Sequence, residues 1–567
     1  MAKEEVDAPV ATAPEIETAP APAPAPVHSV YIAEGTGKTA QNEGAKSKEV
    51  HNAELFAAIQ ESNIPRWSKA SMHLYFCIFI AFCSSYANGY DGSIFSSILG
   101  MAQFQKDIPI GTDGSKVSVV TSLYNVGSIV TTPIAALVSD RFGRRIGMLV
   151  GAIWIIIGSI VTATSGTMAQ LTVGRFILGS GVQFMTVAAP AYAIEIAPPH
   201  WRGRCTGLYN CGWFAGAVPA ACITYGTQFI NNSYAWKVPL ILQNLASVIV
   251  VFSVWFIPES PRFLFAKARD DEAIEFLVRY HGNGNRQSRL VLLEIEEIRE
   301  SIRQDAVDKA KPWWDYSPFF THNGRWRAAQ AIMMGVFGQF SGNGLGYFNV
   351  QIYKLIGVDS QSQQLGYQIL YQAVGAIGAL TAVSLTDRMP RRPVLIYGTF
   401  GVACLLAVNA GLTNAIANDQ AAHGGVITNK NNARGALAFY FLFQTFYSFT
   451  YTPLQGVVPA EALDTTLRAK GLALYGFAVG AVGFINTYAG PIALANITYK
   501  YIYVFVGWDV VEAILWYFFC VEAQGRSLEE LEWVYNQANP VKASQKVDKV
   551  VLQADGTVSE KIVEHAE

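Results

Sequence analysis

The chain has 567 residues, of which 51% are hydrophobic and only 15% are charged. This balance argues against a soluble fold and favours a protein that crosses a membrane several times. The formal net charge of −2 gives no electrostatic reason to expect a nucleic-acid partner. The seven cysteines lie in or beside apolar segments without metal-ligand spacing, and we interpret them as small packing residues.

The N-terminal segment is rich in alanine and proline, with Ala-Pro repeats at 19–26. It contains no apolar core, so it does not resemble a cleaved signal peptide. Residues 1–70 are therefore predicted to form a disordered cytoplasmic tail. We expect the first membrane helix to act as an uncleaved insertion signal.

Twelve segments are apolar over about 20 residues, the length that a membrane-spanning helix needs. The first six are expected near 74–95, 117–138, 146–164, 168–190, 206–226 and 237–257. The second six are expected near 328–350, 366–386, 393–413, 435–458, 470–494 and 501–520. The predicted fold class is an all-α membrane protein with twelve transmembrane helices in two six-helix halves, 71–258 and 328–522.

A polar stretch at 259–327 separates the two halves and is predicted to form a cytoplasmic helical linker. Within it, 290–302 carries apolar residues at helical spacing among Glu and Arg, which predicts a surface helix. The short, charged segment 523–567 is predicted to be a cytoplasmic C-terminal tail. An even number of spans places both termini on the same side of the membrane.

A charged hexapeptide occurs twice, as Asp-Arg-Phe-Gly-Arg-Arg at 140–145 and as Asp-Arg-Met-Pro-Arg-Arg at 387–392. Each copy lies between two long apolar segments, so each marks a loop at a membrane face. Arg and Lys in short loops remain on the cytoplasmic side, which predicts that both termini are cytoplasmic. Two related halves around a central site are the architecture of secondary transporters.

Several motifs resemble those of the sugar porter family of the major facilitator superfamily. Besides the two charged loops, they are Gly174-Arg175, Pro190-x-Tyr192-x-x-Glu195, Arg202-Gly203, Pro258-Glu259-Ser260-Pro261-Arg262, Glu461, Arg468 and the run that begins at Glu522. Within the family, the segments 201–213, 337–349 and 450–457 look most similar to fungal cellodextrin transporters and lactose permeases. The resemblance implies a sugar transporter that is not an enzyme.

Asp91 lies near the outer end of the first span, and Arg175 lies in the fourth. An ionisable group at membrane depth is costly and therefore indicates a function. An Asp beside a guanidinium ionises easily, whereas a desolvated Asp prefers to be neutral, which suits a proton-coupled switch. In proton-coupled sugar porters the matching Asp is the protonation site and the matching Arg is its partner. The alternative is a permanent ion pair that only joins two helices.

Polar side chains on three spans are predicted to bind sugar, because amides donate and accept hydrogen bonds and aromatic faces pack on sugar rings. The candidates are Asn210, Trp213, Gln339, Asn343, Tyr347, Asn349 and Gln455. By resemblance, Asn210 falls where relatives carry a sugar-binding Gln, and Gln339 matches the second Gln of their Gln-Gln-x-Ser-Gly-x-Asn run. The alternative is hydrogen bonding between helices, which Asn and Gln often make in membranes.

Four glycines stand where hexose carriers of the family hold sugar-contacting side chains. They are Gly338, Gly344, Gly375 and Gly456. The resemblance implies that space is gained and hexose contacts are lost, which favours a disaccharide or a longer glucan. The alternative is that these glycines allow helices to pack closely.

Charged residues at the cytoplasmic face are predicted to form a gate, in which opposite charges bridge the two halves when the inside is closed. They are Asp140, Arg141, Arg144, Glu195, Arg202, Glu259, Arg262, Asp387, Arg388, Glu461 and Arg468. Exposed pairs of this kind are individually weak. Asp509 and Glu512 are further acids in the twelfth span, and the sequence leaves open whether they lie on a pathway or face a polar cleft.

The sequence thus predicts a plasma-membrane proton symporter for cellobiose, cellodextrins or lactose that works by alternating access. Its expected partners are a small sugar, protons, the lipid bilayer and cytoplasmic regulators that bind the tails. Two alternatives remain, a facilitative sugar uniporter and a sugar sensor with little net transport. No nucleotide loop, metal-ligand set or nucleophile constellation indicates an enzyme, and no cofactor or metal is expected.

Overall fold

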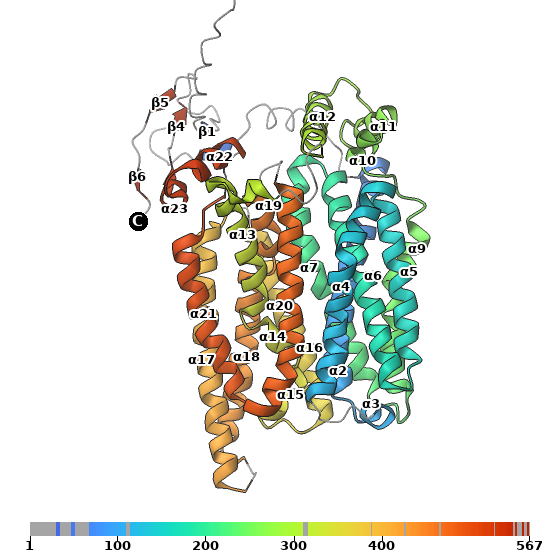
Figure 1. Ribbon diagram of the computed structural model, residues 1–567, viewed down its shortest axis with the longest axis vertical. Coiled ribbons are helices and arrows are strands. Elements are labelled where there is room, and N and C mark those ends of the chain that lie inside the picture. The colour runs from blue at the N-terminus through green and yellow to red at the C-terminus, as the bar shows by residue number, and fades with distance from the viewer. Residues whose placement is uncertain are drawn as a thin grey trace, which may run out of the picture.

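The computed structural model contains two adjacent helical bundles, one from each half of the chain (Figure 1). The helices of the first half, coloured blue to green, lie on the right, and those of the second half, yellow to red, lie on the left. The structure describes residues 30–33, 47–50, 67–108, 114–309, 316–386, 388–424, 427–463, 467–524, 526, 528–547, 550–552, 558–560 and 564–565. Most of the predicted N-terminal tail lies outside the described residues.

The first half consists of long helices joined by short turns. Its helices are α2 (Lys69–Leu99), α3 (Ala102–Asp107), α4 (Gly114–Phe142), α5 (Arg144–Ala163), α6 (Met168–Ile196), α7 (Pro199–Thr227), α8 (Tyr234–Leu242) and α9 (Asn244–Ser253). Ser68 begins α2, because its side chain accepts the backbone N–H of Ser71 at 3.0 Å. Between α4 and α5 the chain turns at Gly143 alone, whose φ of 102° favours glycine.

The second half contains interrupted helices. Its helices are α13 (His322–Phe340), α14 (Asn343–Gly346), α15 (Asn349–Leu355), α16 (Gln361–Leu385), α17 (Arg391–Ala422), α18 (Lys430–Thr450), α19 (Leu454–Ala462), α20 (Arg468–Ile497) and α21 (Lys500–Phe519). The predicted seventh span is broken at Gly342, which has a φ of 80°. The predicted tenth span is broken before Pro453, which has no N–H to continue the helix. Both breaks free backbone groups inside the bundle.

One end of the bundle carries both charged loops, and we call it the basic end after Arg144, Arg145, Arg391 and Arg392. Smaller helices cover this end, at the top of Figure 1. They are α10 (Pro261–Ala266), α11 (Asp270–Tyr280), α12 (Arg289–Lys309), η1 (Ser317–Phe320), α22 (Leu528–Asn536) and α23 (Pro540–Ser544). The surface helix predicted at 290–302 is confirmed, because α12 contains it.

Part of the segment predicted as a C-terminal tail is packed against the second half. In α22, Leu531, Val534 and Tyr535 are buried. The guanidinium carbon of Arg327 at the start of α13 lies 4.6 Å from the centre of the Tyr535 ring. These apolar residues recur at helical spacing among charged ones, a pattern that the overall charge of the segment concealed.

Short strands lie in the described parts of the terminal segments. They are β1 (Val30–Ala33), β2 (Ser47–Val50), β3 (Lys546–Val547), β4 (Val550–Leu552), β5 (Val558–Glu560) and β6 (Glu564–His565). One sheet has the order β2-β1-β4-β5, in which β1 pairs antiparallel with β2 and parallel with β4. A second, two-stranded sheet pairs β3 with β6. Both chain ends thus contribute to one sheet.

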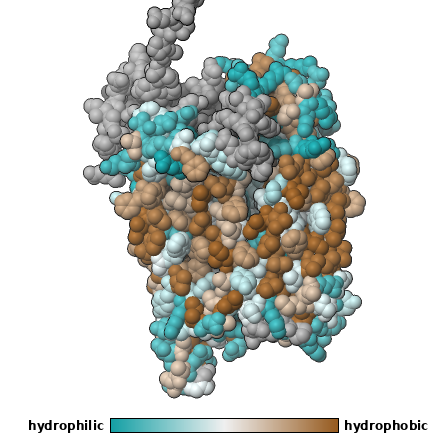
Figure 2. Space-filling model, in the orientation of Figure 1, coloured by the Kyte–Doolittle hydropathy of each residue, from teal (hydrophilic) through white to brown (hydrophobic). Residues whose placement is uncertain are grey.

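The described residues contain nine helices long and apolar enough to cross a membrane, with α8 and α9 counted together. Figure 2 shows hydrophobic residues across the middle of the face in view, with hydrophilic residues toward both ends. The helices outside this group of nine include α7, α13 and α18, which have 29, 19 and 21 residues. Polar residues lower their hydropathy, and α7 and α13 carry Asn210 and Gln339 of the predicted sugar site.

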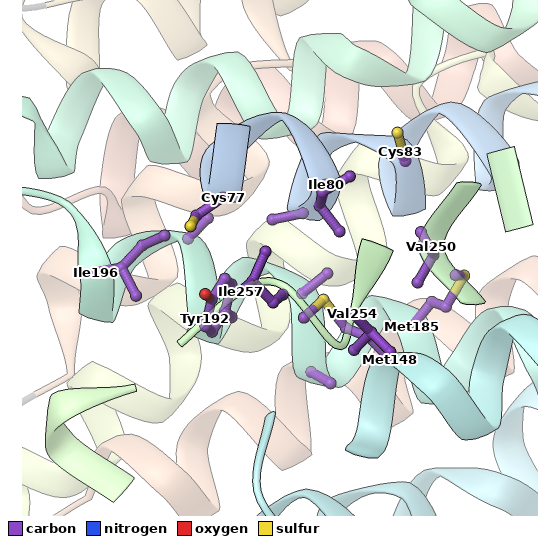
Figure 3. Close-up of a cluster of buried hydrophobic side chains, with 14 of the residues drawn as sticks. Cys77, Ile80, Cys83, Met148, Met185, Tyr192, Ile196, Val250, Val254 and Ile257 are labelled. Atoms are coloured by element: carbon purple, nitrogen blue, oxygen red, sulfur yellow. The ribbon is translucent and has the colours of Figure 1, made fainter. Parts of the chain in front are cut away.

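Each half has its own hydrophobic core. In the first half, Cys77, Ile80, Met148 and Met185 are buried where α2, α5 and α6 meet (Figure 3). All seven cysteines are free thiols, and all except Cys222 and Cys404 are buried. The buried thiols agree with their interpretation as small packing residues.

Candidate functional site

A buried ion pair joins α2 and α6 in the first half. Arg175 Nη1 donates to Asp91 Oδ1 at 3.0 Å, and the two side chains are only 6% and 2% exposed. The guanidinium carbon lies 4.3 Å from the ring centre of Phe95 and 4.8 Å from that of Tyr124. Asp91 Oδ2 is buried and has no hydrogen-bond partner in the described structure. The predicted contact is therefore present, and one carboxylate oxygen can still take a proton.

The neighbours of Asp91 connect this ion pair to α7 and to the second half. Trp213 of α7 packs on the next residue, since a Cβ on Gly92 would lie 3.4 Å from Trp213 Nε1. Two residues after Asp91, Ser93 Oγ accepts a hydrogen bond from Gln372 Nε2 of α16 at 3.1 Å. A movement of α2 at Asp91 would therefore also displace residues that contact α7 in the first half and α16 in the second half.

Amide side chains from four helices, α13, α14, α19 and α20, surround the break between α13 and α14. Asn343 Nδ2 donates to Gln339 Oε1 at 3.3 Å. Asn486 of α20 donates to the backbone carbonyl of Gln339 at 2.8 Å, and Gln455 of α19 donates to that of Gly338 at 3.1 Å. Gln339, Asn343 and Gln455 are each partly exposed, so they retain hydrogen-bonding capacity for a ligand.

At three of the four glycines, a side chain of another helix occupies the space that a Cβ atom would need. A Cβ would meet Gln455 Nε2 at Gly338 (2.5 Å), Asn486 Cγ at Gly344 (2.9 Å) and Phe214 Cε1 at Gly375 (2.7 Å). The expected gain in volume is therefore not present as empty space at these positions. Close packing places side chains of other helices where a hexose carrier would project its own.

The remaining sugar-binding candidates divide into two groups. Asn210, Trp213 and Tyr347 are partly exposed. Asn349, in contrast, is fully buried, donates to Gln368 Oε1 at 2.8 Å and accepts from the Tyr440 hydroxyl at 2.6 Å. Its amide nitrogen and oxygen both bind other helices, which favours the interhelical alternative for this residue.

At the basic end, each half contains the same arginine–glutamate pair. Arg144 donates through Nε and Nη2 to Glu195, at 3.1 Å each. Arg391 donates through the same two nitrogens to Glu461, at 3.3 and 2.9 Å. Bidentate pairs of this kind fix direction as well as distance. Both pairs lie within one half, so they brace each half rather than bridging the two.

A second glutamate in each half caps the helix that follows the charged loop. Glu259 accepts the backbone N–H groups of Arg144 and Arg145 at 3.2 and 3.4 Å. Glu522 accepts those of Arg391 and Arg392 at 3.0 and 2.9 Å. A carboxylate at a helix N-terminus satisfies free donors and complements the helix dipole. Burial raises the pKa of Glu259 above its ordinary value, because its charge is partly removed from water.

Another predicted gate residue, Arg202, binds the small helices of the basic end. Its Nη2 donates to Glu294 of α12 at 2.8 Å. Glu294 is fully buried and also contacts His281 Nδ1 at 2.6 Å, while His281 Nε2 lies 3.1 Å from the carbonyl of Ile196. This network fastens α12 to the ends of α6 and α7.

The other predicted gate residues are exposed, half-buried or outside what the structure describes. Asp140 lies 3.4 Å from Arg144 and is exposed, as are Arg141 and Arg388. Arg262 is half-buried. Asp387 and the side chain of Arg468 lie outside what the structure describes.

Hydrogen bonds between the two halves occur near the end opposite to the basic end. Thr121 of α4 donates to the carbonyl of Thr487 of α20 at 2.9 Å, and Asn125 donates to Thr487 Oγ1 at 2.9 Å. Beyond them, the backbone N–H of Ala102 donates to Gln361 Oε1 at 3.1 Å. These contacts hold the halves together at that end.

Sequence reasoning missed several of these polar groups. Gln372, Gln444 and Asn486 are buried amides within predicted spans, and none of them is among the sugar-binding residues predicted from the sequence. An amide in an apolar span is a detectable signal, but the sequence does not show which face of the helix presents it. The contacts of Gln444 with Gly375, of Asn486 with Gly344 and of Gln372 with Ser93 required the structure.

Comparison with known proteins completes the assignment. Residues 76–535 match the family described as "Sugar (and other) transporter". The high-affinity glucose transporter of Kluyveromyces lactis is 30% identical over 82% of this chain and 86% of the relative. The MFS-type transporter criB of Aspergillus cristatus is 26% identical over 86% of this chain and 98% of the relative.

The fold is similar to that of solved transporters. The partially occluded inward open structure of the E. coli xylose transporter XylE has a TM-score of 0.66 and 18% identity, and the match covers 81% of this chain and all (100%) of that one. A second XylE structure, described as an MFS (major facilitator superfamily) proton:xylose symporter, has a TM-score of 0.66 and 19% identity, over 82% and 100% of the two chains. The chain therefore belongs to the sugar transporter family and has the major facilitator fold.

Proposed function

We propose that this protein is a proton-coupled sugar symporter that imports its substrate across the plasma membrane by alternating access. The observation that carries the proposal is the Asp91–Arg175 pair, buried at membrane depth with Asp91 Oδ2 unpartnered in the described structure. A proton on Asp91 removes the charge that attracts Arg175, which weakens the link between α2 and α6. The proton can thus change how these helices move.

The groups around the break in α13 support a sugar as the substrate. Gln339, Asn343 and Gln455 are partly exposed amides, and Asn210 and Trp213 are partly exposed on α7. Sugar hydroxyl groups both donate and accept hydrogen bonds, and amides match them in both roles. The names of the yeast relatives and of XylE, which refer to glucose and xylose, agree with this chemistry.

The substrate class that we propose is cellobiose, cellodextrins or lactose. The support is the glycine set, because α13 presents only backbone at Gly338 and α14 presents only backbone at Gly344. A second sugar ring can approach that backbone where Gln455 and Asn486, which now fill the space, turn aside. A hexose carrier with its own side chains at these positions has no such room.

Contacts between the halves support alternating access. Thr121 and Asn125 bind Thr487 near the end opposite to the basic end, which we propose to be the outer side. The arginine–glutamate pairs of the basic end each lie within one half. We propose that the charged loops, and both termini, face the cytoplasm. Rocking of the halves then opens the site to one side at a time.

The test uses a yeast strain that lacks its own sugar carriers and expresses the full chain. Uptake of labelled cellobiose or lactose should exceed that of glucose, and each addition should make an unbuffered medium more alkaline. Cells that carry an empty vector are the control. Uptake that stops at equilibrium without alkalinisation would indicate a uniporter. Signalling without uptake would indicate a sensor, and uptake of glucose alone would overturn the disaccharide proposal.

A further inference from the structure

Two further acids lie at membrane depth in the second half, and the proposed function does not use them. Asp509 and Glu512 are three residues apart on α21, so they lie on one face of that helix, and both are fully buried. In the described structure neither forms an ion pair, and neither Asp509 oxygen has a hydrogen-bond partner. Two ionised carboxylates so close together and away from water are strongly unfavourable.

Glu512 contacts both interrupted helices. Its Oε2 hydrogen-bonds with the hydroxyl of Ser341, the residue that ends α13. The same oxygen accepts from the hydroxyl of Tyr451, which ends α18, at 3.3 Å. Trp516 Nε1 donates to Tyr451 at 3.2 Å and helps to hold that hydroxyl in place. One carboxyl group of α21 therefore connects the breaks of the seventh and tenth spans.

The hydrogen atoms in this network can be counted. The Ser341 hydroxyl has one hydrogen, and the carbonyl of Phe337, 2.7 Å away, can only accept. That single hydrogen cannot serve both Phe337 and Glu512. A protonated Glu512 supplies the missing hydrogen and donates it to Ser341. Both contacts of the Ser341 hydroxyl can be hydrogen bonds at the same time only when Glu512 carries a proton.

We propose that Asp509 and Glu512 form a second proton-binding site, whose proton fixes the relative positions of the two helix breaks. With the proton bound, Glu512 donates to Ser341 and accepts from Tyr451. When the proton leaves to water, the O–H bond of Glu512 breaks and the Ser341 hydroxyl must turn from Phe337 to the carboxylate. The end of α13 then loses one of its hydrogen bonds and can move relative to α18.

The surroundings of Glu512 agree with a neutral acid. The titratable groups that face it are Asp509 on its own helix and Tyr447 and Tyr451 on α18 or directly after it. None of these is a cation at neutral pH, in contrast to Arg175 beside Asp91. The role in transport rests on the proposed function, whereas the occupancy of the site by a proton does not.

Infrared difference spectroscopy of the full chain in lipid nanodiscs tests the occupancy. The carbonyl stretch of a protonated carboxyl group should be present at neutral pH and should change in Glu512→Gln, where any remaining signal of this site comes from Asp509 alone. It should persist in Asp91→Asn and in Val511→Ala, which alters a partly exposed residue of the same helix. Should Glu512→Gln fail to fold, Asp509→Asn should still shift the pH range over which the band disappears. An unchanged band in Glu512→Gln, or an unchanged range in Asp509→Asn, overturns the proposal.

Sugar exchange without net proton movement tests the link between the helix breaks. Glu512→Gln keeps a donor and an acceptor, so its exchange should continue and lose its dependence on pH. Glu512→Leu keeps the approximate volume without hydrogen bonds, so its exchange should be slow at every pH. Exchange in Glu512→Leu at the parental rate and pH profile overturns the role. Failure of the symport proposal would instead show as accumulation that survives in Asp91→Asn, with the infrared result unaffected.

Discussion

The two halves hold their buried acids in opposite ways. In the first half, Asp91 is paired with Arg175 at 3.0 Å. In the second half, Asp509 and Glu512 have no cation beside them among the described residues; Glu512 contacts the hydroxyls of Ser341 and Tyr451, and the Asp509 oxygens have no hydrogen-bond partner there. A carboxylate beside a guanidinium is stabilised as a charge, whereas an acid among hydroxyls is stabilised as a proton donor. The two proton sites that we propose are therefore of different kinds.

At the basic end, by contrast, the halves agree almost atom by atom. Arg144 and Arg391 both bind a glutamate through Nε and Nη2, and Glu259 and Glu522 both cap the next helix. The repeated loop thus has the same geometry in both halves, whereas the buried acids of the membrane-spanning helices differ between them. This difference is consistent with a basic end that braces each half and with our proposal that substrate and proton bind deeper in the bundle.

The largest expected effect is that of Asp91→Asn, which removes the proposed proton acceptor of the first half. Accumulation of sugar against a gradient should be abolished, whereas exchange, which needs no net proton movement, should continue. The measurement is labelled uptake with and without internal sugar, normalised to protein at the surface. Accumulation by a well-expressed Asp91→Asn carrier would show that the paired acid is not the coupling site.

Arg175→Ala should also abolish accumulation, and it should destabilise the protein as well. Removal of one partner leaves a buried charge unpaired, at a cost of about 3–5 kcal/mol. The double variant Asp91→Asn, Arg175→Ala removes both charges, so its melting temperature should lie above that of Arg175→Ala. Equal melting temperatures for the single and double variants would contradict the ion-pair interpretation.

Gly338→Gln tests the glycine set in the second half. The new side chain would collide with Gln455, and overpacking of this kind costs about 1–3 kcal/mol. Disaccharide uptake should fall more than glucose binding, and adding Gln455→Gly should restore stability because it removes the collision. Gly476→Ala is a suitable control, since nothing lies within 4 Å of a Cβ there. Unchanged cellobiose uptake in stable Gly338→Gln would place the site elsewhere.

The smallest effects are expected from Arg144→Lys and Arg391→Lys, made separately. Lysine keeps the charge but loses the two-nitrogen contact, which should cost about 1–2 kcal/mol in each half. Thermal unfolding of the purified protein should show similar losses for both variants. A neutral effect in one half only would mean that the two loops are not equivalent after all.

The sequence predicted the fold well and the details of the site only in part. Long apolar segments and the repeated loop predicted two helical halves. A membrane span requires about 20 apolar residues, and short cytoplasmic loops are rich in arginine, so both features can be recognised in the sequence. Asp91 and Arg175 could be paired because ionisable residues are rare in spans. The filling of Gly338 by Gln455 could not be predicted, because it depends on contacts between helices distant in sequence. The contact of Glu512 with both helix breaks required their geometry for the same reason.

The modest apolarity of α7, α13 and α18 has a consequence for how the protein is made. The translocon releases a helix into lipid more readily as its apolar content rises, and buried amides oppose that release. These helices carry or adjoin the residues proposed to bind sugar, and we expect them to need neighbouring helices for insertion. Replacing Gln339 or Gln444 with leucine should therefore raise the yield of inserted protein even where it removes transport. The polar residues that we propose to bind sugar are therefore expected to lower the efficiency with which these helices insert into the membrane.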